Sequence, residues 1–197
     1  MNTLKAEKRT MDTKAKRLRR EGYVTGNVFG REEGSLPVKI EKSAVEKLLK
    51  TSNKGSQIML DVDGQSYDVL IKEIQFNPLK GQVDEIDFQA LVSNEKVHSV
   101  AEIVLVNHDK LEAGVLQQHL EEISFRALPS ALVDKVMVDV GDMKVGDVIK
   151  VKDLAIAQDK DVDLKTDLEA AVVSVAAVHA DPTLEAEEEA AAEEEAK

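Results

Sequence analysis

The feature of this chain that most restricts its fold is the alternation of apolar and polar residues over positions 57–76. The alternation runs in two stretches, and the pair Asp63-Gly64 separates them. Strict alternation is typical of half-buried strands, and a two-residue Asp-Gly link is typical of a tight hairpin. The segment therefore predicts a β-hairpin, and the pair Asn77-Pro78 ends its second strand because Pro has no N–H for the ladder. The apolar positions are Ile58, Leu60 and Val62, then Tyr67, Val69 and Ile71.

The rest of the first half also predicts short elements. Strands are expected at 3–9, 23–29, 36–41 and 86–90. A cationic stretch that can turn helically lies between the first two, and Gly22 is placed to end it. The segment 43–50 predicts a two-turn helix in which Ser43 is the N-cap and Glu46 completes a capping box. Residues 1–92 therefore predict a mixed sheet or small β-barrel that carries one or two short helices.

The second half predicts a separate all-β domain. Alternating stretches occur at 97–107, 119–127, 133–140 and 148–154, and a last strand is expected at 168–178. From position 181 the chain is mostly Ala and Glu, a composition that cannot bury enough apolar surface to fold. The chain is thus predicted to be mainly β, with a small barrel at 1–92, a C-terminal β domain at 93–180 and a disordered acidic tail at 181–197.

Positive charge is concentrated at the start of an acidic chain. The formal net charge is −12, yet eight of the first twenty residues are Lys or Arg and only two are acidic. A solvated surface is the ordinary explanation of a charge run. Here the contrast with the rest of the chain favours a polyanionic partner, because Lys and Arg beside phosphates release condensed counterions. Lys16, Arg19 and Arg20 would share one face if this stretch is helical.

The sequence gives little support to catalysis or to a bound cofactor. It contains no Cys, and its four His, at positions 98, 108, 119 and 179, show no helical i,i+4 pair. No glycine pattern resembles a phosphate cradle, and no Ser/His arrangement supports a triad. The longest apolar run, 170–178, is too short to span a bilayer. We therefore expect no enzyme, no metal, no cofactor and no membrane contact, in a cytoplasmic protein.

Three ordered segments carry a family resemblance. TKAKRLRREGYVTGNVFG resembles the R-x-L-R-x-x-G-x-x-P-x-x-x-Y-G opening of the Ctc family, the 5S rRNA-binding large-subunit ribosomal proteins numbered twenty-five. VLIKEIQFNPLKGQVDEIDFQAL resembles that family's K-x-x-Q-x-x-P-x-x-x-x-x-x-H-x-D-F segment. FRALPSALVDKVMVDVGDMKVGDVIKVKDL resembles its C-terminal β domain, and the long form of the family commonly ends in a Glu-rich tail.

The resemblance implies an RNA-binding barrel at 1–92 that docks on the loop E region of 5S rRNA, in a non-catalytic component of the large ribosomal subunit. It also implies a second β domain that either faces outward or touches neighbouring ribosomal components, such as ribosomal proteins. Polar side chains on strands would test base or ribose edges, and long cations would fix the position on the backbone. The residues that match the family's RNA-contacting positions are Arg9, Lys14, Arg17, Arg19 and Asp87. Together with Lys16, Arg20, Phe29, Gln75, Asn77 and Glu85 they form the expected RNA-binding set.

The chain departs from the family pattern at three positions. Thr25 replaces a Pro, Phe29 replaces a Tyr, and Glu85 replaces a His. The last two remove polar groups that the resemblance expects to face RNA, and Glu85 adds a negative charge that phosphates would repel. These departures leave open an alternative, a stress-related protein–protein adaptor with weakened RNA binding that works through its acidic β domain. Among the aromatic residues, Tyr67, Phe76 and Phe88 are predicted to lie in the core, whereas Tyr23 and Phe29 fit either environment.

Overall fold

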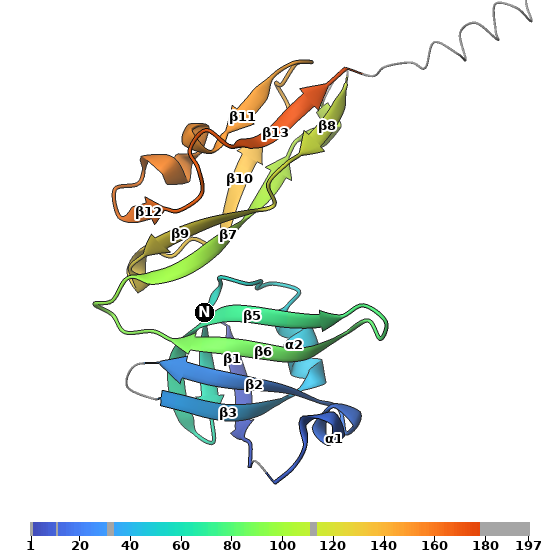
Figure 1. Cartoon of the computed structure of the whole chain (residues 1–197), viewed down its shortest axis with the longest axis vertical. Helices are drawn as coiled ribbons and strands as arrows, with labels where there is room; N and C mark the ends of the chain where they lie inside the picture. The colour runs from blue at the N-terminus through green and yellow to red at the C-terminus, as the bar shows by residue number, and fades with distance from the viewer. Residues whose placement is uncertain (1, 11, 31–33, 111–113, 178–197) are drawn as a thin grey trace, which may run out of the picture.

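The protein has two β-rich parts, each with its own hydrophobic core, in a computed structural model that describes residues 2–10, 12–30, 34–110 and 114–177. Figure 1 shows the N-terminal part as a barrel and the C-terminal part as an elongated sheet structure beyond one end of it. The predicted fold class, mainly β with short helices, is confirmed. The predicted disordered tail at 181–197 lies outside the described residues.

Six strands close the N-terminal barrel in the order β1-β3-β2-β6-β5-β4. Neighbouring strands are mostly antiparallel, but two parallel pairings, β1 with β4 and β2 with β6, bring distant segments together and complete the ring. A closed ring leaves no free strand edge. The elements are β1 (Thr3–Lys8), α1 (Ala15–Arg20), β2 (Tyr23–Gly30), β3 (Gly34–Glu41), α2 (Lys42–Leu48), β4 (Gln57–Val62), β5 (Gln65–Asn77) and β6 (Gln82–Ala90).

The hairpin predicted from the alternation at 57–76 is confirmed as β4 and β5. Val62 pairs with Gln65, so Asp63 and Gly64 form a two-residue turn, and both have positive φ, 51° and 89°. This is the backbone conformation that a tight hairpin needs and that Asp-Gly tolerates. The predicted apolar positions on these two strands pack in the barrel core, and so does Phe88 of β6, which is 0% exposed.

The predicted core position of Phe76 is wrong, because its side chain is 60% exposed. Two irregularities interrupt the pairing of β5 with β6, one at Lys72 and one at Asp84. Phe76 lies beyond the second of them, opposite Val83, and β6 pairs with β2 only from Glu85 onward. The end of this hairpin therefore projects past the neighbouring strand, which leaves the ring of Phe76 in solvent.

The capping box predicted for the second helix is also absent. Helix α2 begins at Lys42, its N-cap is Glu41, and the cap makes no side-chain hydrogen bond. The N–H of Lys42 instead donates to the carbonyl oxygen of Gly22, at 3.0 Å. Strand β3 thus runs directly into the helix, and a backbone carbonyl from the α1–β2 turn accepts from the first N–H of the helix.

The C-terminal β domain consists of a four-stranded sheet in the order β10-β7-β9-β12 and a three-stranded sheet in the order β11-β13-β8. Most predicted strands are present, but the two short strands β8 and β12 were not predicted, and the stretch 148–154 is a strand only to Lys150. The strands are β7 (Val97–Val106), β8 (Val115–Gln118), β9 (Glu122–Ala127), β10 (Lys135–Asp139), β11 (Val148–Lys150), β12 (Val162–Leu164) and β13 (Ala171–Ala176), with 3₁₀ turns η1 (His108–Lys110), η2 (Pro129–Ala131), η3 (Val151–Asp153) and η4 (Ala155–Gln158).

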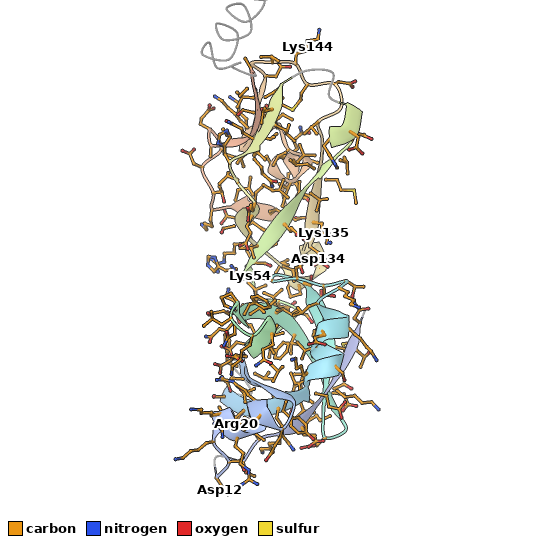
Figure 2. The ribbon with its side chains drawn as sticks, turned by 90° about the vertical axis from the view of Figure 1, so that its right-hand side faces the viewer. Asp12, Arg20, Lys54, Asp134, Lys135 and Lys144 are labelled. Carbon is orange, nitrogen blue, oxygen red and sulfur yellow. The ribbon has the colours of Figure 1, made fainter. Side chains whose placement is uncertain are left out.

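A set of polar contacts joins the barrel to the C-terminal β domain, and we call this region the joint. The Ser99 hydroxyl donates to the carbonyl oxygen of Gly55 at 3.2 Å, and Lys72 Nζ donates to the carbonyl oxygen of His98 at 2.8 Å. Leu70, which is fully buried, and Phe125 of β9 line one cavity between the two parts. Figure 2 shows Lys54, Asp134 and Lys135 gathered where the two parts meet.

One ion pair and an amide contact reinforce the joint. Lys54 pairs with Glu122 at 3.1 Å, and Asn53 Nδ2 donates to Glu102 Oε2 at 2.6 Å. Glu102 also lies 3.6 Å from Lys135 Nζ. The Glu102–Lys135 pair lies within the C-terminal β domain, whereas the contacts of Lys54 and Asn53 cross to it from the barrel. The two parts therefore touch through side chains as well as through the chain that connects them.

Candidate nucleic-acid interface

The cationic stretch predicted to meet a polyanion forms the short helix α1 and the loop before it. Leu18 is buried against the barrel, and Gly22, with φ +91°, ends the helix as predicted. Figure 2 places Asp12 and Arg20 at the end of the barrel farthest from the joint. The cations of this stretch therefore project from the end of the molecule opposite the C-terminal β domain.

Three of the predicted cations are exposed and have no side-chain partner among the residues that the structure describes. These are Lys14, Lys16 and Arg20. Arg17 is also exposed, at 76%, but its Nε lies 2.8 Å from Glu21 Oε1, and this hydrogen bond raises the pKa of Arg17. An exposed ion pair of this kind is weak, so it leaves Arg17 able to exchange Glu21 for a phosphate.

The other two predicted arginines turn toward the protein. Arg9 is half-buried, and its Nη2 donates to the carbonyl oxygen of Thr13 at 3.1 Å, which braces the loop before α1. Its buried Nε has no partner among the described residues. Arg19 donates to groups on two strands of the barrel, described below. The sequence did not distinguish these cations from one another. In the structure, Lys14, Lys16 and Arg20 have no partner among the described residues, whereas Arg9 and Arg19 donate to groups of the protein.

The predicted strand residues come together on the outer face of β5, β6 and β2, which lie side by side in Figure 1. Register places Glu85 between Thr25 on one side and Gln75 on the other. Two residues along β6, Asp87 lies beside Asn27, and Phe29 follows on β2. Gln75 is exposed, whereas Phe29, Glu85 and Asp87 are half-buried. The face is therefore polar and lies next to α1.

Asp87 is the most restrained carboxylate of this face. Its Oδ1 accepts a hydrogen bond from the backbone N–H of Asn27 at 3.1 Å. Burial raises the pKa of Asp87, and the nearby carboxylate of Glu73 adds to the effect. The other oxygen of Asp87 has no partner among the described residues, so it can accept from a ligand. Asn27 is held in turn, because its Oδ1 accepts from the Ser35 hydroxyl at 3.0 Å.

Asn77 is turned back into the hairpin rather than presented to a ligand. Its Nδ2 donates to Asp84 Oδ2 at 3.0 Å, and Gln82 donates to the other oxygen at 3.3 Å. The hydrogen bond from Asn77 lowers the pKa of Asp84, and Gln82 adds to it. Sequence reasoning missed Asp84, because its role depends on the irregular pairing of β5 with β6, which no local pattern announces.

The interface thus has two chemically different parts. The free cations of α1 and its loop can neutralise phosphates, as positively charged side chains do in most nucleic-acid complexes. The carboxylates of Glu73 and Asp87 can only accept hydrogen bonds, so their ligands would be base amino or imino groups or a ribose 2′-OH. Such a combination suits a folded RNA surface with exposed base edges better than a uniform duplex.

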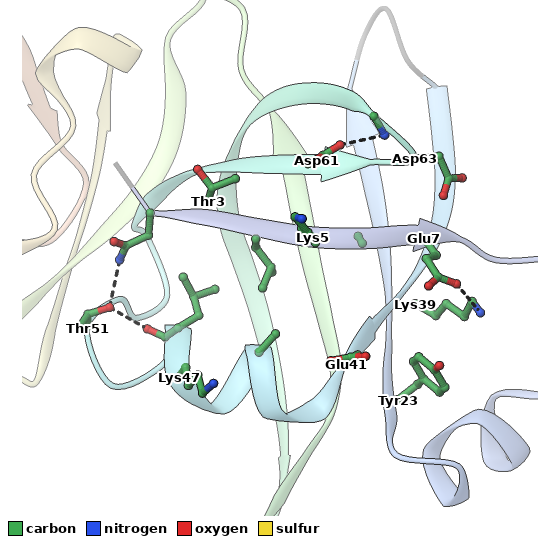
Figure 3. A pocket seen from close by; sticks show the side chains of 16 residues that line it. Thr3, Lys5, Glu7, Tyr23, Lys39, Glu41, Lys47, Thr51, Asp61 and Asp63 are labelled. Atoms are coloured by element: carbon green, nitrogen blue, oxygen red, sulfur yellow. Dashed lines mark hydrogen bonds and ion pairs between the residues drawn. The ribbon is translucent and has the colours of Figure 1, made fainter.

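A groove of about 780 Å³ on another side of the barrel carries lysines that are already offset. Figure 3 shows Lys39 beside Glu7 and Tyr23; Lys39 Nζ lies 2.7 Å from Glu7 Oε2 and 4.9 Å from the centre of the Tyr23 ring. The hydrogen bond with Glu7 raises the pKa of Lys39. The other charged residues that line the groove are Lys5, Lys47, Glu41, Asp61 and Asp63. With four acids against three lysines, this groove does not favour a polyanion.

Other site classes find no support in the described part of the chain. Those residues contain no group of three or more His, Asp or Glu side chains placed to hold a metal ion. None of the helices they form is long and apolar enough to cross a membrane. His98, His108 and His119 are all exposed and lie apart on β7, in η1 and before β9, and His179 lies outside the described residues.

Comparison with known proteins gives matches over both parts of the chain. The model of the Ribosomal L25p family matches residues 4–88, and the model of the ribosomal protein TL5 C-terminal domain matches residues 96–179. Both describe ribosomal proteins rather than enzymes.

Three curated relatives, each called large ribosomal subunit protein bL25, match this chain over most of its length and over most of their own. That of Geobacillus thermodenitrificans is 35% identical over 71% of this chain and 67% of its own. That of Listeria monocytogenes serotype 4b is 31% identical over 91% of this chain and 87% of its own. That of Caldanaerobacter subterraneus is 30% identical over 88% of this chain and 88% of its own. The chain therefore belongs to the ribosomal L25p/TL5 family, in the bL25 long form that carries a C-terminal domain.

Proposed function

We propose that this protein is a non-catalytic component of the large ribosomal subunit that binds 5S rRNA through α1, the loop before it and the outer face of β2, β6 and β5. The observation that carries the proposal is the placement of Lys14, Lys16 and Arg20. All three are exposed, and none has a partner among the described residues, in a chain whose net charge is −12. Membership of the bL25 family supports the choice of RNA.

The two parts of the interface have different roles in this proposal. Phosphate contacts from the three free cations set affinity and position, whereas Gln75, Asp87 and Asn27 test base or ribose edges. The half-buried ring of Phe29 lies at the end of the same face and offers a surface on which a base can stack. We assign Arg9 to support of the loop, and Asn77 to support of the hairpin.

The domain division follows from the same proposal. Residues 1–92 act as the RNA-binding unit, and residues 93–180 face away from the RNA toward neighbouring ribosomal components. The joint supports this division, because it lies at the end of the barrel opposite α1. The protein would then work in the cytoplasm as part of the ribosome.

A gel shift of the full-length chain with 5S rRNA over a salt series tests the proposal. Three phosphate contacts predict that log K falls against log salt with a slope of about −2 to −3. The protein should also co-sediment with 50S particles through a low-salt gradient. Binding to 5S rRNA that is undetectable at low salt, or that does not change with salt, would contradict the electrostatic assignment.

The second candidate, a protein–protein adaptor that works through the C-terminal β domain, is favoured by one observation. Met137 is 73% exposed on β10, a strand at the edge of its sheet. An exposed apolar residue on an open edge suits strand pairing with another chain. In that case the full-length protein would migrate apart from 50S particles and would not shift 5S rRNA at low salt.

A further inference from the structure

Arg19 connects helix α1 to two strands of the barrel. Its Nε donates to the carbonyl oxygen of Asp84 at 2.9 Å, and its Nη2 donates to the Thr25 hydroxyl at 3.2 Å. The same Nη2 lies 3.4 Å from Glu85 Oε2. The Arg19 side chain is 28% exposed and that of Glu85 is 34% exposed, so this ion pair is screened less than a fully solvated one.

The acceptors exist because of the local strand geometry. Gln75 pairs with Glu85 and Phe76 with Val83, so Asp84 is the extra residue of β6 and is opposite no residue of β5 in the register of the two strands. Its carbonyl oxygen accepts from both Arg19 Nε and the Thr25 hydroxyl, the latter at 3.3 Å. Thr25 is fully buried and lies beside Glu85 in the parallel register.

We propose that Arg19 is a positioning residue that fixes α1 to the barrel, with Thr25, Asp84 and Glu85 as its receptor, and that it does not neutralise a phosphate. A six-residue helix cannot maintain itself in water, because nucleation of an isolated helix is unfavourable. Leu18 supplies an apolar contact. Arg19 adds hydrogen bonds whose donor is charged, and such bonds are stronger than those between neutral groups.

This role sets the direction of the free cations. With Leu18 buried and Arg19 bound to the barrel, Lys14, Lys16 and Arg20 remain exposed on the other sides of α1 and its loop. Glu85 then acts as the counter-ion of Arg19, and its negative charge is partly neutralised before any RNA approaches. Thr25 and Glu85, two positions where the chain departs from the pattern described above, thus contribute to one contact set.

The first experiment needs no RNA. Amide hydrogen exchange of α1 in the free full-length chain reports how firmly the helix is held. The N–H of Glu21 is a suitable probe, because it donates to the carbonyl oxygens of Arg17 and Leu18, at 3.1 Å each. Arg19→Gln and Thr25→Val should each speed this exchange, by about tenfold or more for Arg19→Gln, since bonds to a charged group are lost. Arg20→Gln, the matched control on the same helix, should leave exchange unchanged.

The second experiment rests on the proposed function and uses the salt series with 5S rRNA. Arg20→Gln should reduce the magnitude of the salt slope by about 0.9, the value for one phosphate contact. Arg19→Gln should weaken binding at every salt concentration with the slope unchanged, because the phosphate contacts remain but the helix must be ordered on binding. In the hydrogen-exchange experiment, Glu85→Gln keeps an acceptor near Arg19, so it should speed exchange of the Glu21 N–H less than Arg19→Gln does.

The results separate the two proposals. If wild-type protein does not bind 5S rRNA, the function fails, while the exchange data still decide the role of Arg19. If Arg19→Gln leaves the exchange of α1 unchanged and lowers the salt slope as Arg20→Gln does, Arg19 is a phosphate ligand and the positioning role is wrong.

Discussion

The backbone of Gly55 lies so close to Val100 that a Cβ on Gly55 would collide with the carbonyl oxygen of Val100. The same residue has φ +89° and accepts the hydrogen bond from Ser99. Gly55 lies in the loop before β4, and Val100 and Ser99 lie on β7. The joint between the barrel and the C-terminal β domain therefore depends on a residue without a side chain.

Gly55→Ala should open the joint, because it adds both backbone strain and a collision. Gly64→Ala is the matched control, since Gly64 has the same φ of +89° with nothing near its missing Cβ. Strain alone should cost about 1–2 kcal/mol in thermal or denaturant unfolding. Gly55→Ala should cost more than Gly64→Ala, and small-angle scattering should show a larger radius of gyration for it alone. Equal losses in the two variants would show that Val100 yields without cost.

Lys16→Ala combined with Arg20→Ala should weaken 5S rRNA binding without affecting the fold. Each lost phosphate contact removes about 0.9 from the magnitude of the salt slope, so the pair should remove nearly 2. Lys47→Ala with Lys50→Ala is the charge-matched control, because both lysines are exposed: Lys47 lines the groove of Figure 3, and Lys50 lies just after α2. Gel shifts at several salt concentrations measure both, and similar losses in the two pairs would mean that net charge, rather than α1, governs binding.

Phe76→Ala and Phe88→Ala should have very different effects on stability. Phe88 is 0% exposed in the barrel core, and its truncation should cost about 3–5 kcal/mol. Phe76 is 60% exposed on the projecting hairpin, and its truncation should cost about 0.5 kcal/mol or less. Urea unfolding of the full-length variants measures the difference, and a large loss for Phe76→Ala would restore it to the core.

Glu169 should stabilise the fold at neutral pH, and this contribution should be lost in acid. Glu169 bonds to Lys150 at 2.7 Å and to Lys152 at 2.8 Å, and these two contacts lower its pKa from 4.5 to about 2. A carboxyl whose pKa is lower in the folded state stabilises the fold above its unfolded pKa, and this contribution disappears as pH falls toward the folded value. Glu169→Gln should therefore lower the Tm at pH 7, and the difference from wild type should shrink between pH 4.5 and about 2.

High salt provides a second check on Glu169. The side chain is exposed, so ions should screen both contacts, and 1 M NaCl should reduce the difference in Tm at pH 7. Calorimetry of the two proteins in low and high salt measures this effect. A difference that persists at both low pH and high salt would indicate that Glu169 contributes through its shape rather than its charge.

The sequence predicted local structure better than long-range structure. Asp63-Gly64 determines its own turn and the register of the strands beside it, so the hairpin could be read directly. The parallel pairings of β1 with β4 and of β2 with β6 could not, because nothing local indicates which distant strands meet. The position of Phe76 and the role of Asp84 depend on irregular pairing between β5 and β6, which the alternation of residues does not reveal.

The candidate interface was predictable as a region and less so residue by residue. Charge density located the cationic stretch, and α1 and its loop do project from the barrel. Charge density alone does not tell a free cation from a bound one, and the difference between Arg20 and Arg19 depends on acceptors contributed by Thr25 and Asp84. The remaining assignments came from the family resemblance, and their RNA contacts remain predictions.

The two parallel pairings of the barrel also constrain when the protein can fold. Thr3 pairs opposite Met59, and Thr25 pairs opposite Glu85, so each pairing closes a loop of about sixty residues. Non-local contacts of this kind slow folding, because the chain must give up entropy before the contact forms. During synthesis, the first strand has no β4 to pair with until Met59 has left the ribosome. The cations of α1 are therefore made, and can meet RNA, before the barrel that positions them is complete.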